Sequence, residues 1–189
     1  SANDSPPNDP RRTAAPSTAL VDRVAAQRPA FHLLAGDICY ADPSGHGLPE
    51  RSDGGSGFDS FDPTVWTTYF GLIERSAAST PWMFATGNHD MEALYDDNRA
   101  RGASHGYGGH AARLDLPGNG PAGCPSVYAF RHGTVGVVSV DANDLSTEIP
   151  TNAGYSGGRQ TAWLRDTLAA LRADPGVDWV VLFFHHCAF

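Results

Sequence analysis

The stretch FHLLAGDICY (residues 31–40) decides the fold prediction, because it joins an apolar strand to side chains with useful chemistry. Residues 31–35 form a short apolar run between a proline and a glycine, which predicts a buried strand. The carboxylate of Asp37 follows directly, and the phenol of Tyr40 lies three residues further on. The sequence therefore places a carboxylate and a phenol together at the end of a core strand.

Two further segments repeat this pattern of an apolar run that ends in polar side chains. They are PWMFATGNHD (residues 81–90) and VDWVVLFFHH (residues 177–186). Each segment alone is also typical of a polar loop, but three in succession favour a shared site. Ligands of open α/β sheets bind beyond the carboxyl ends of the strands. If the three strands are neighbours, one crevice collects the side chains of Asp37, Tyr40, Asn88, His89, Asp90, His185 and His186.

The remaining segments complete an alternation of helices and strands. Helices are predicted at residues 17–28, 63–77 and 158–174, and a hairpin is predicted at residues 126–141. Residues 42–63 and 91–125 show no periodicity, and residues 1–16 read as a disordered or loop segment. The order favours a layered α/β domain over residues 17–189 with at least partly parallel strands.

Composition limits the possible partners. The formal charge is −8, with 13 basic and 21 acidic residues. This charge argues against non-specific binding of nucleic acid, because such binding needs basic patches. No apolar run reaches the roughly 18 residues of a membrane span. Cys39, Cys124 and Cys187 form no C-x-x-C pair, so they indicate neither a zinc ribbon nor a disulfide framework, although one disulfide stays open if the protein is exported.

The expected site chemistry is that of metal-assisted displacement. Two metal ions about 3.5–4 Å apart can clamp the attacking and leaving oxygens of an in-line reaction. Ions held so close need an anionic bridge, and Asp37 is the carboxylate placed to provide it. Imidazole and amide groups suit a divalent transition metal. The phenolate of Tyr40 would favour a trivalent ion such as Fe(III).

GDICY, GNHD and VVLFFHH resemble three successive blocks of the calcineurin-like metallophosphoesterases, and the tyrosine makes purple acid phosphatases the most similar branch. The resemblance covers residues 21–189 and implies a layered metallophosphoesterase-type β-sandwich flanked by helices. It implies hydrolysis of small phosphate monoesters at a binuclear metal centre, with a metal-bound hydroxide as nucleophile. The implied cofactors are Fe(III) and a divalent ion, either Fe, Zn or Mn.

The same resemblance implies the metal ligands. Asp37 would bridge the two ions, and Tyr40 would ligate the ferric ion. Asn88 and His185 would ligate the divalent ion, and Asn88 would also contact substrate.

It also implies the catalytic groups. His89 would face the substrate, where it stabilises phosphoryl oxygens or protonates the leaving oxygen. Asp90 would orient the His89 imidazole. His186 stays open, because the alternation of a strand lets only one of the pair His185–His186 point into the crevice, and the resemblance favours His185.

Two blocks of the family have no counterpart in this sequence. These are an Asp-x-Gly or Asp-x-His before the first block and a Gly-His-x-His after the third. We therefore expect an internal fragment that is incomplete at both ends and weakly active at best on its own. The resemblance and the absence of an initial methionine favour a secreted or periplasmic protein, with a cytoplasmic location as the alternative. The oligomeric state stays open.

Two other functions remain as alternatives. One is a phosphodiesterase or nucleotidase of the same superfamily, which Tyr40 disfavours. The other is a non-catalytic carbohydrate- or protein-binding module on the same scaffold, which the intact site residues disfavour, namely Asp37, Asn88, His89 and His185. Among the remaining histidines, His32 is predicted to be a core or edge residue. Surface positions are predicted for His46, His105, His110 and His132.

Overall fold

The computed structural model describes residues 15–38, 64–91, 107–149 and 152–187. Its helices are α1 (Ala15–Ala26), α2 (Thr64–Ala77), α3 (Gly108–Arg113) and α4 (Arg159–Ala173). Its strands are β1 (His32–Ala35), β2 (Trp82–Ala85), β3 (Tyr128–His132), β4 (Val135–Ser139) and β5 (Trp179–Phe183). Short 3-10 turns, η1 (Asn88–Asp90) and η3 (Ala142–Asp144), follow β2 and β4. The predicted strands, the hairpin and the helices around α2 and α4 are therefore all present.

The strands form two sheets. In the first, β1 and β2 run parallel, with Leu34 opposite Phe84. In the second, in the order β3-β4-β5, β3 and β4 are antiparallel and β4 and β5 are parallel. The mixture of parallel and antiparallel pairs confirms the prediction of a partly parallel α/β architecture.

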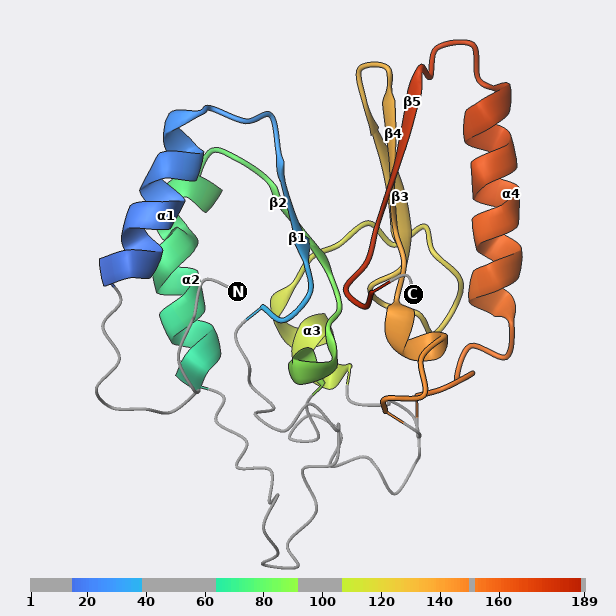
Figure 1. The fold of residues 1–189 in the computed structure, drawn as a ribbon, viewed down its shortest axis with the longest axis horizontal. Helices are drawn as coiled ribbons and strands as arrows, with labels where there is room; N and C mark the ends of the chain where they lie inside the picture. The colour runs from blue at the N-terminus through green and yellow to red at the C-terminus, as the bar shows by residue number, and fades with distance from the viewer. Residues whose placement is uncertain (1–14, 39–63, 92–106, 150–151, 188–189) are drawn as a thin grey trace, which may run out of the picture.

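The two sheets lie between helices in a layered arrangement (Figure 1). Helices α1 and α2 lie on the outer side of the β1-β2 sheet, and α4 lies along the outer side of the second sheet. Gly136 of β4 admits this packing, because a Cβ there would lie 2.8 Å from a methyl carbon of Leu171 of α4. The result is the expected β-sandwich flanked by helices.

Side chains that alternate along β1 and β2 build two separate cores. Leu34 and Phe84 pack towards α1 and α2. Leu33 and Met83 face the second sheet. The first core also contains Val21, Trp66, Tyr69 and Ile73, and the second contains Tyr128, Val137 and Phe183. Because successive residues of a strand point to opposite faces, the apolar residues of each strand serve both cores.

The prediction of a fully buried final strand is wrong. The side chain of Trp179 is 71% exposed, and those of Val181 and Leu182 are 38% and 40% exposed. Strand β5 lies at an edge of the described sheet, so burial is complete only near its end, at Phe183. An apolar run indicates a strand, but the position of the strand in its sheet decides how much is covered.

The start of one helix and the presence of another also differ from prediction. Helix α1 begins at Ala15 rather than after Ser17. Helix α3 lies inside the segment 91–125 that was expected to be a loop, and it buries His110, which has only 2% of its surface exposed instead of the predicted surface position. A six-residue helix is too short to produce a recognisable apolar period. His32, as predicted, lies half-buried in β1, with its ring against Trp82.

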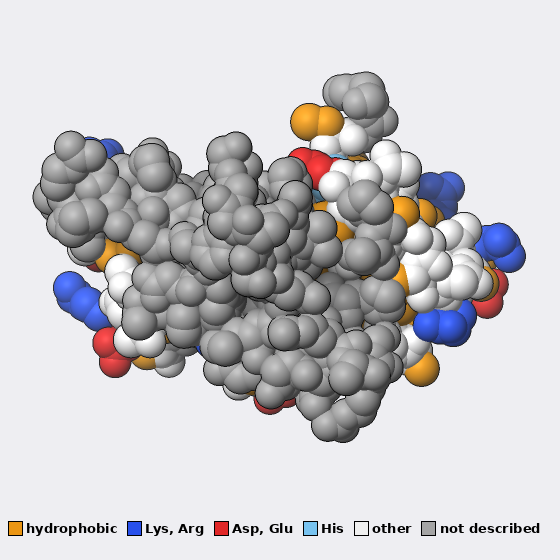
Figure 2. Space-filling model, turned by 90° about the horizontal axis from the view of Figure 1, so that it is seen from below, with side chains coloured by type: hydrophobic (Ala, Val, Ile, Leu, Met, Phe, Trp, Pro, Cys, Tyr) orange, Lys and Arg blue, Asp and Glu red, His pale blue; other side chains and the backbone are white. Residues whose placement is uncertain are grey.

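The described helices are each too short or too polar to cross a membrane. Figure 2 shows the molecule from below, where described arginine and acidic side chains are visible at the left and right margins.

Candidate metal and substrate site

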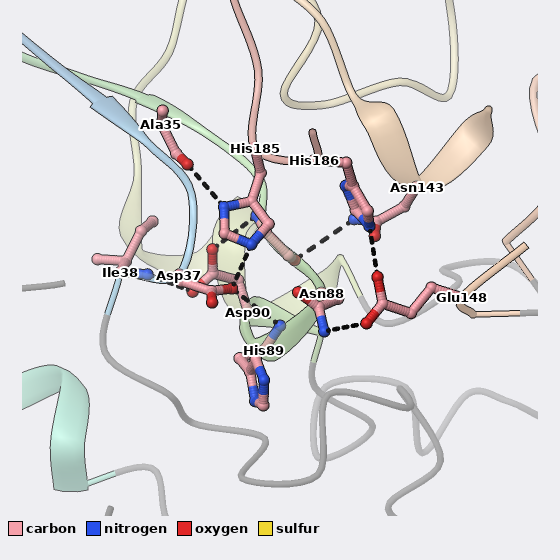
Figure 3. Close-up of polar contacts among 11 residues, drawn as sticks. Ala35, Asp37, Ile38, Asn88, His89, Asp90, Asn143, Glu148, His185 and His186 are labelled. Atoms are coloured by element: carbon pink, nitrogen blue, oxygen red, sulfur yellow. Dashed lines mark hydrogen bonds and ion pairs between the residues drawn. The ribbon is translucent and has the colours of Figure 1, made fainter. Parts of the chain in front are cut away.

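Strands β1, β2 and β5 all end at the same side of the molecule, the lower side in Figure 1. The sequence suggested that these strands are neighbours, but they do not all belong to one sheet. Strands β1 and β2 form the first sheet, and β5 lies in the second. Their ends still converge, because the two sheets pack face to face through the second core. Figure 3 shows the polar side chains that meet there.

A tight turn after β1 directs Asp37 into this convergence. Gly36 and Asp37 both have positive φ angles, 75° and 51°. A non-glycine residue in this region carries local strain, which accumulates at functional sites. Gly36 must be a glycine, because a Cβ there would lie 2.7 Å from the Cβ of His185 and 2.6 Å from the amide nitrogen of Gly87. The three strand ends can approach one another only because this side chain is missing.

Asp37 and His185 are in direct contact. His185 Nε2 lies 3.1 Å from Asp37 Oδ1, and His185 Nδ1 donates a hydrogen bond of 2.8 Å to the carbonyl oxygen of Ala35. The bond at Nδ1 fixes the ring and directs Nε2 at the carboxylate, which is the usual arrangement of a metal-ligating histidine. Burial lowers the pKa of His185, but the hydrogen bonds to Asp37 and Ala35 and the charges of Asp37 and Asp90 outweigh it, so the net pKa is raised.

Asp90 is completely buried and ties the first two strand ends together. One oxygen accepts the amide N–H of Ile38 at 2.7 Å, and the other accepts that of Gly87 at 2.8 Å. Burial, with the neighbouring charge of Asp37, raises the pKa of Asp90 to about 7, against the lowering effect of the two amides. The resemblance implied that Asp90 orients the His89 imidazole. The structure shows its carboxylate supporting the backbone of both turns, and the orientation of His89 by Asp90 stays a prediction.

His89 approaches the centre through its backbone. Its amide N–H donates to Asp37 Oδ1 at 3.3 Å, while its imidazole extends away from the Asp37–His185 pair (Figure 3). The side chain lines a cleft that also contains Asn88 and His185. A group in this position can meet a substrate in the cleft without ligating the same ion as Asp37.

Glu148 joins two of the predicted site residues, and sequence reasoning missed it. Asn88 Nδ2 donates to Glu148 Oε1 at 3.2 Å, and His186 Nε2 lies 3.1 Å from Glu148 Oε2 (Figure 3). Glu148 lies in an irregular segment after η3, where no apolar run precedes it to mark it. Its only sequence signal is a carboxylate shortly after a strand end.

Both histidines of the His185–His186 pair line the cleft, contrary to the expectation that only one would do so. The alternation of a strand does not apply to them, because β5 ends at Phe183 and the chain bends at His185 and His186. The rings pack edge to face, with centroids 5.4 Å apart. One ring therefore faces Asp37 and the other faces Glu148.

The cleft has a volume of about 1070 Å³ and combines a polar and an apolar wall. Asn88, His89, Glu148, His185 and His186 form the polar side. Val140, Leu145, Leu164, Leu182 and Phe184 contribute apolar surface. A cleft lined by both kinds of side chain can bind a ligand that carries a charged group and an organic group.

A buried polar network around Asp141 contacts the turn that carries Asn88. Asp141, fully buried after β4, accepts hydrogen bonds from the hydroxyls of Tyr107 and Tyr155. It also accepts the amide N–H of Asn143, whose side chain in turn donates to the carbonyl oxygen of Gly87 at 3.4 Å. The network thereby reaches the turn that carries Asn88. Burial raises the pKa of Asp141, against the lowering effect of its hydrogen-bond donors.

The described residues supply part of a metal site. A carboxylate, an imidazole and an amide suit a divalent transition metal, and the ring orientation of His185 fits ligation through Nε2. No group of three His, Cys, Asp or Glu side chains with metal-binding geometry occurs within residues 15–38, 64–91, 107–149 and 152–187. Tyr40 and Cys39 lie outside the described residues, so the role of Tyr40 as a ferric ligand stays a prediction.

Comparisons with known proteins agree with the motifs. Two proteins of Mycobacterium tuberculosis, the uncharacterized proteins MT2654 (strain CDC 1551 / Oshkosh) and Rv2577 (strain ATCC 25618 / H37Rv), are each 31% identical over 178 residues. The aligned region covers 90% of this chain but 28% of each relative, so the chain spans less than a third of the length of the curated relatives it matches.

A family comparison covers nearly the whole chain. The sequence model of the calcineurin-like phosphoesterases matches residues 13–189, which include all three motif blocks and every site residue described above. The family match and the converging strand ends lead to one conclusion: the chain belongs to the calcineurin-like phosphoesterases, a family of metal-dependent phosphoester hydrolases.

Proposed function

We propose that this protein hydrolyses phosphate monoesters at a binuclear metal centre built around Asp37 and His185. The contact between these two side chains carries the proposal. It joins the ends of strands from different sheets, and each partner is a type of group that ligates metals. Membership of the family supports metal-dependent phosphoester hydrolysis in general and does not specify monoesters or two metal ions.

Each residue has a task in this proposal. Asp37 would bridge the ions, and Asn88 and His185 would hold the divalent one. When bound, the two ions would polarise the phosphoryl group and activate water as the nucleophile. His89, a residue that lines the cleft, would contact the phosphoryl oxygens or deliver a proton to the leaving oxygen.

The proposed metal pair is Fe(III) with a divalent ion, either Fe, Zn or Mn. This part rests on Tyr40 alone, because a phenolate favours a ferric ion and gives a visible charge-transfer band. The test is Tyr40→Phe in the full-length protein loaded with iron. The absorption band should disappear, and a band of unchanged intensity would rule out Tyr40 as the chromophore.

The activity itself is tested with two chromogenic esters. The full-length protein, loaded with Mn²⁺ or Zn²⁺, should release nitrophenol from para-nitrophenyl phosphate faster than from bis(para-nitrophenyl) phosphate. His185→Ala and Asn88→Ala should abolish turnover, whereas His132→Ala, at an exposed position at the end of β3, serves as the matched control and should retain it. Preference for the diester would support the phosphodiesterase alternative, and no turnover of either ester would contradict the proposal.

A further inference from the structure

We infer that Glu148 is a positioning residue, which orients the Asn88 amide for metal ligation and contacts the His186 imidazole that packs beside His185. The inference rests on the proposed function, because it concerns the same cleft. Glu148 uses its two oxygens separately, Oε1 for Asn88 at 3.2 Å and Oε2 for His186 at 3.1 Å. It therefore contacts both groups at once (Figure 3).

The contact with Asn88 determines which end of the amide faces the cleft. An asparagine amide has a donor nitrogen and an acceptor oxygen, and only the oxygen is a useful ligand for a cation. A carboxylate beside Nδ2 accepts its N–H and would repel Oδ1 if the amide were reversed. Glu148 therefore favours the orientation in which Oδ1 points away from it, as metal ligation by Asn88 requires.

The contact with His186 holds a second ring beside the predicted ligand His185. Nε2 of His186 faces the carboxylate, and the ring packs edge to face on His185 at an interplanar angle of 80°. Neither ring nitrogen of His186 has a hydrogen-bond partner among the described residues, so the 3.1 Å approach of Nε2 to Glu148 is a polar contact that Glu148→Ala would remove. One carboxylate thus acts on both the turn after β2 and the bend after β5.

The location of Glu148 separates a positioning role from a purely structural one. Its side chain is 50% exposed, and polar contacts of such exposure, even between full charges, add little to the stability of a fold. Partners that orient metal ligands, in contrast, commonly affect metal affinity by about 10–100-fold. The two roles therefore predict different results. Removal of a stabilising carboxylate would lower the free energy of unfolding, whereas removal of a positioning carboxylate would weaken metal binding.

The experiment compares Glu148→Ala and Glu148→Gln with wild-type full-length protein, using calorimetric titration with Mn²⁺ and thermal unfolding of the metal-free form. Glu148→Ala should raise the Kd for Mn²⁺ by about 10–100-fold, with the number of bound ions and the unfolding midpoint unchanged. Glu148→Gln keeps an oxygen that can accept from Asn88 and should restore part of the affinity. Glu74→Gln, at an exposed position of α2, is the matched control and should bind Mn²⁺ as the wild type does.

Three results would overturn the inference. An unchanged Kd in Glu148→Ala would show that the contacts orient nothing. The loss of a whole bound ion would make Glu148 a ligand rather than a positioning residue. A wild-type protein that takes up no Mn²⁺ would contradict both this inference and the proposed function. Because the titration needs no substrate, a protein that binds Mn²⁺ tightly but cleaves no ester would remove the proposed function and leave the role of Glu148 intact.

Discussion

Asp37 Oδ1 and His185 Nε2 lie 3.1 Å apart, although one residue follows β1 in the first sheet and the other follows β5 in the second. The same histidine reaches the carbonyl oxygen of Ala35 across 150 positions of sequence. The contact therefore exists only when the two sheets have packed against each other. It makes the candidate metal site dependent on the assembly of the whole sandwich.

Metal binding at this contact should stabilise the fold. A ligand present at 100 times its Kd adds about 2.7 kcal/mol to the free energy of unfolding. We expect Mn²⁺ to raise the unfolding midpoint of chelator-treated protein, and Asp37→Asn to abolish most of that rise. Asp166→Asn, at an exposed position of α4, should leave the rise intact. Equal rises in the two variants, measured by differential scanning calorimetry, would exclude Asp37 as a ligand.

Gly87→Ala should disrupt the turn after β2. An added Cβ would collide with the backbone nitrogen and the carboxylate oxygen of Asp37, which cannot both move without breaking the site. We expect a loss of at least about 2 kcal/mol in the free energy of unfolding, on the scale of overpacking a well-packed core. Gly71→Ala is the control, because Gly71 lies in α2 with open space around it. That variant should gain roughly 0.4–1 kcal/mol. Urea unfolding measures both, and equal effects would contradict the close approach.

Asp90→Asn should destabilise the protein, although it removes a buried charge. Both carboxylate oxygens accept backbone N–H groups, and an asparagine presents an NH₂ group to one of them. A buried donor left without an acceptor costs about 1–3 kcal/mol. Asp166→Asn provides the exposed comparison in the same urea experiment. A variant as stable as the wild type would show that the two amides find other acceptors.

His110 should make stability depend on pH. Burial, with the charge of Arg113, lowers the pKa of His110 to about 4 from its ordinary value of 6.5. Between these values the unfolded chain binds a proton that the folded protein does not, so this residue destabilises the fold as the pH falls, by up to about 3 kcal/mol. Asp90 acts in the opposite direction across this whole range, because its pKa is raised from 3.8 to about 7 in the folded protein. As the pH falls, the folded form therefore binds a proton that the unfolded chain does not, which stabilises the fold.

The difference between wild type and His110→Gln isolates this contribution. The variant removes the titrating ring, so its free energy of unfolding should fall less steeply than that of the wild type from pH 6.5 to pH 4. His132→Gln, at an exposed position, should follow the wild-type curve. Parallel curves for wild type and His110→Gln in denaturant unfolding would refute the assignment.

The order of the elements could be read from the sequence because it depends on local signals. Apolar runs that stop at glycine or at polar residues gave β1, β2 and β5, and the helical period gave α2 and α4. The same reasoning failed for β5 burial and for α3. Burial at an edge depends on which strands lie alongside, and a six-residue helix contains too few turns for its period to be recognised.

The types of the site residues were likewise fixed by the sequence, since Asp37, Asn88 and His185 each follow a strand and strand ends position ligands. Their partners were not. The contacts of Glu148 with Asn88 and His186, and of Asp90 with Ile38 and Gly87, join segments that are remote in sequence. The sequence determines which groups arrive at strand ends, because that depends on neighbouring residues. Only the tertiary structure decides which groups touch, because the packing of two sheets sets distances that no local pattern encodes.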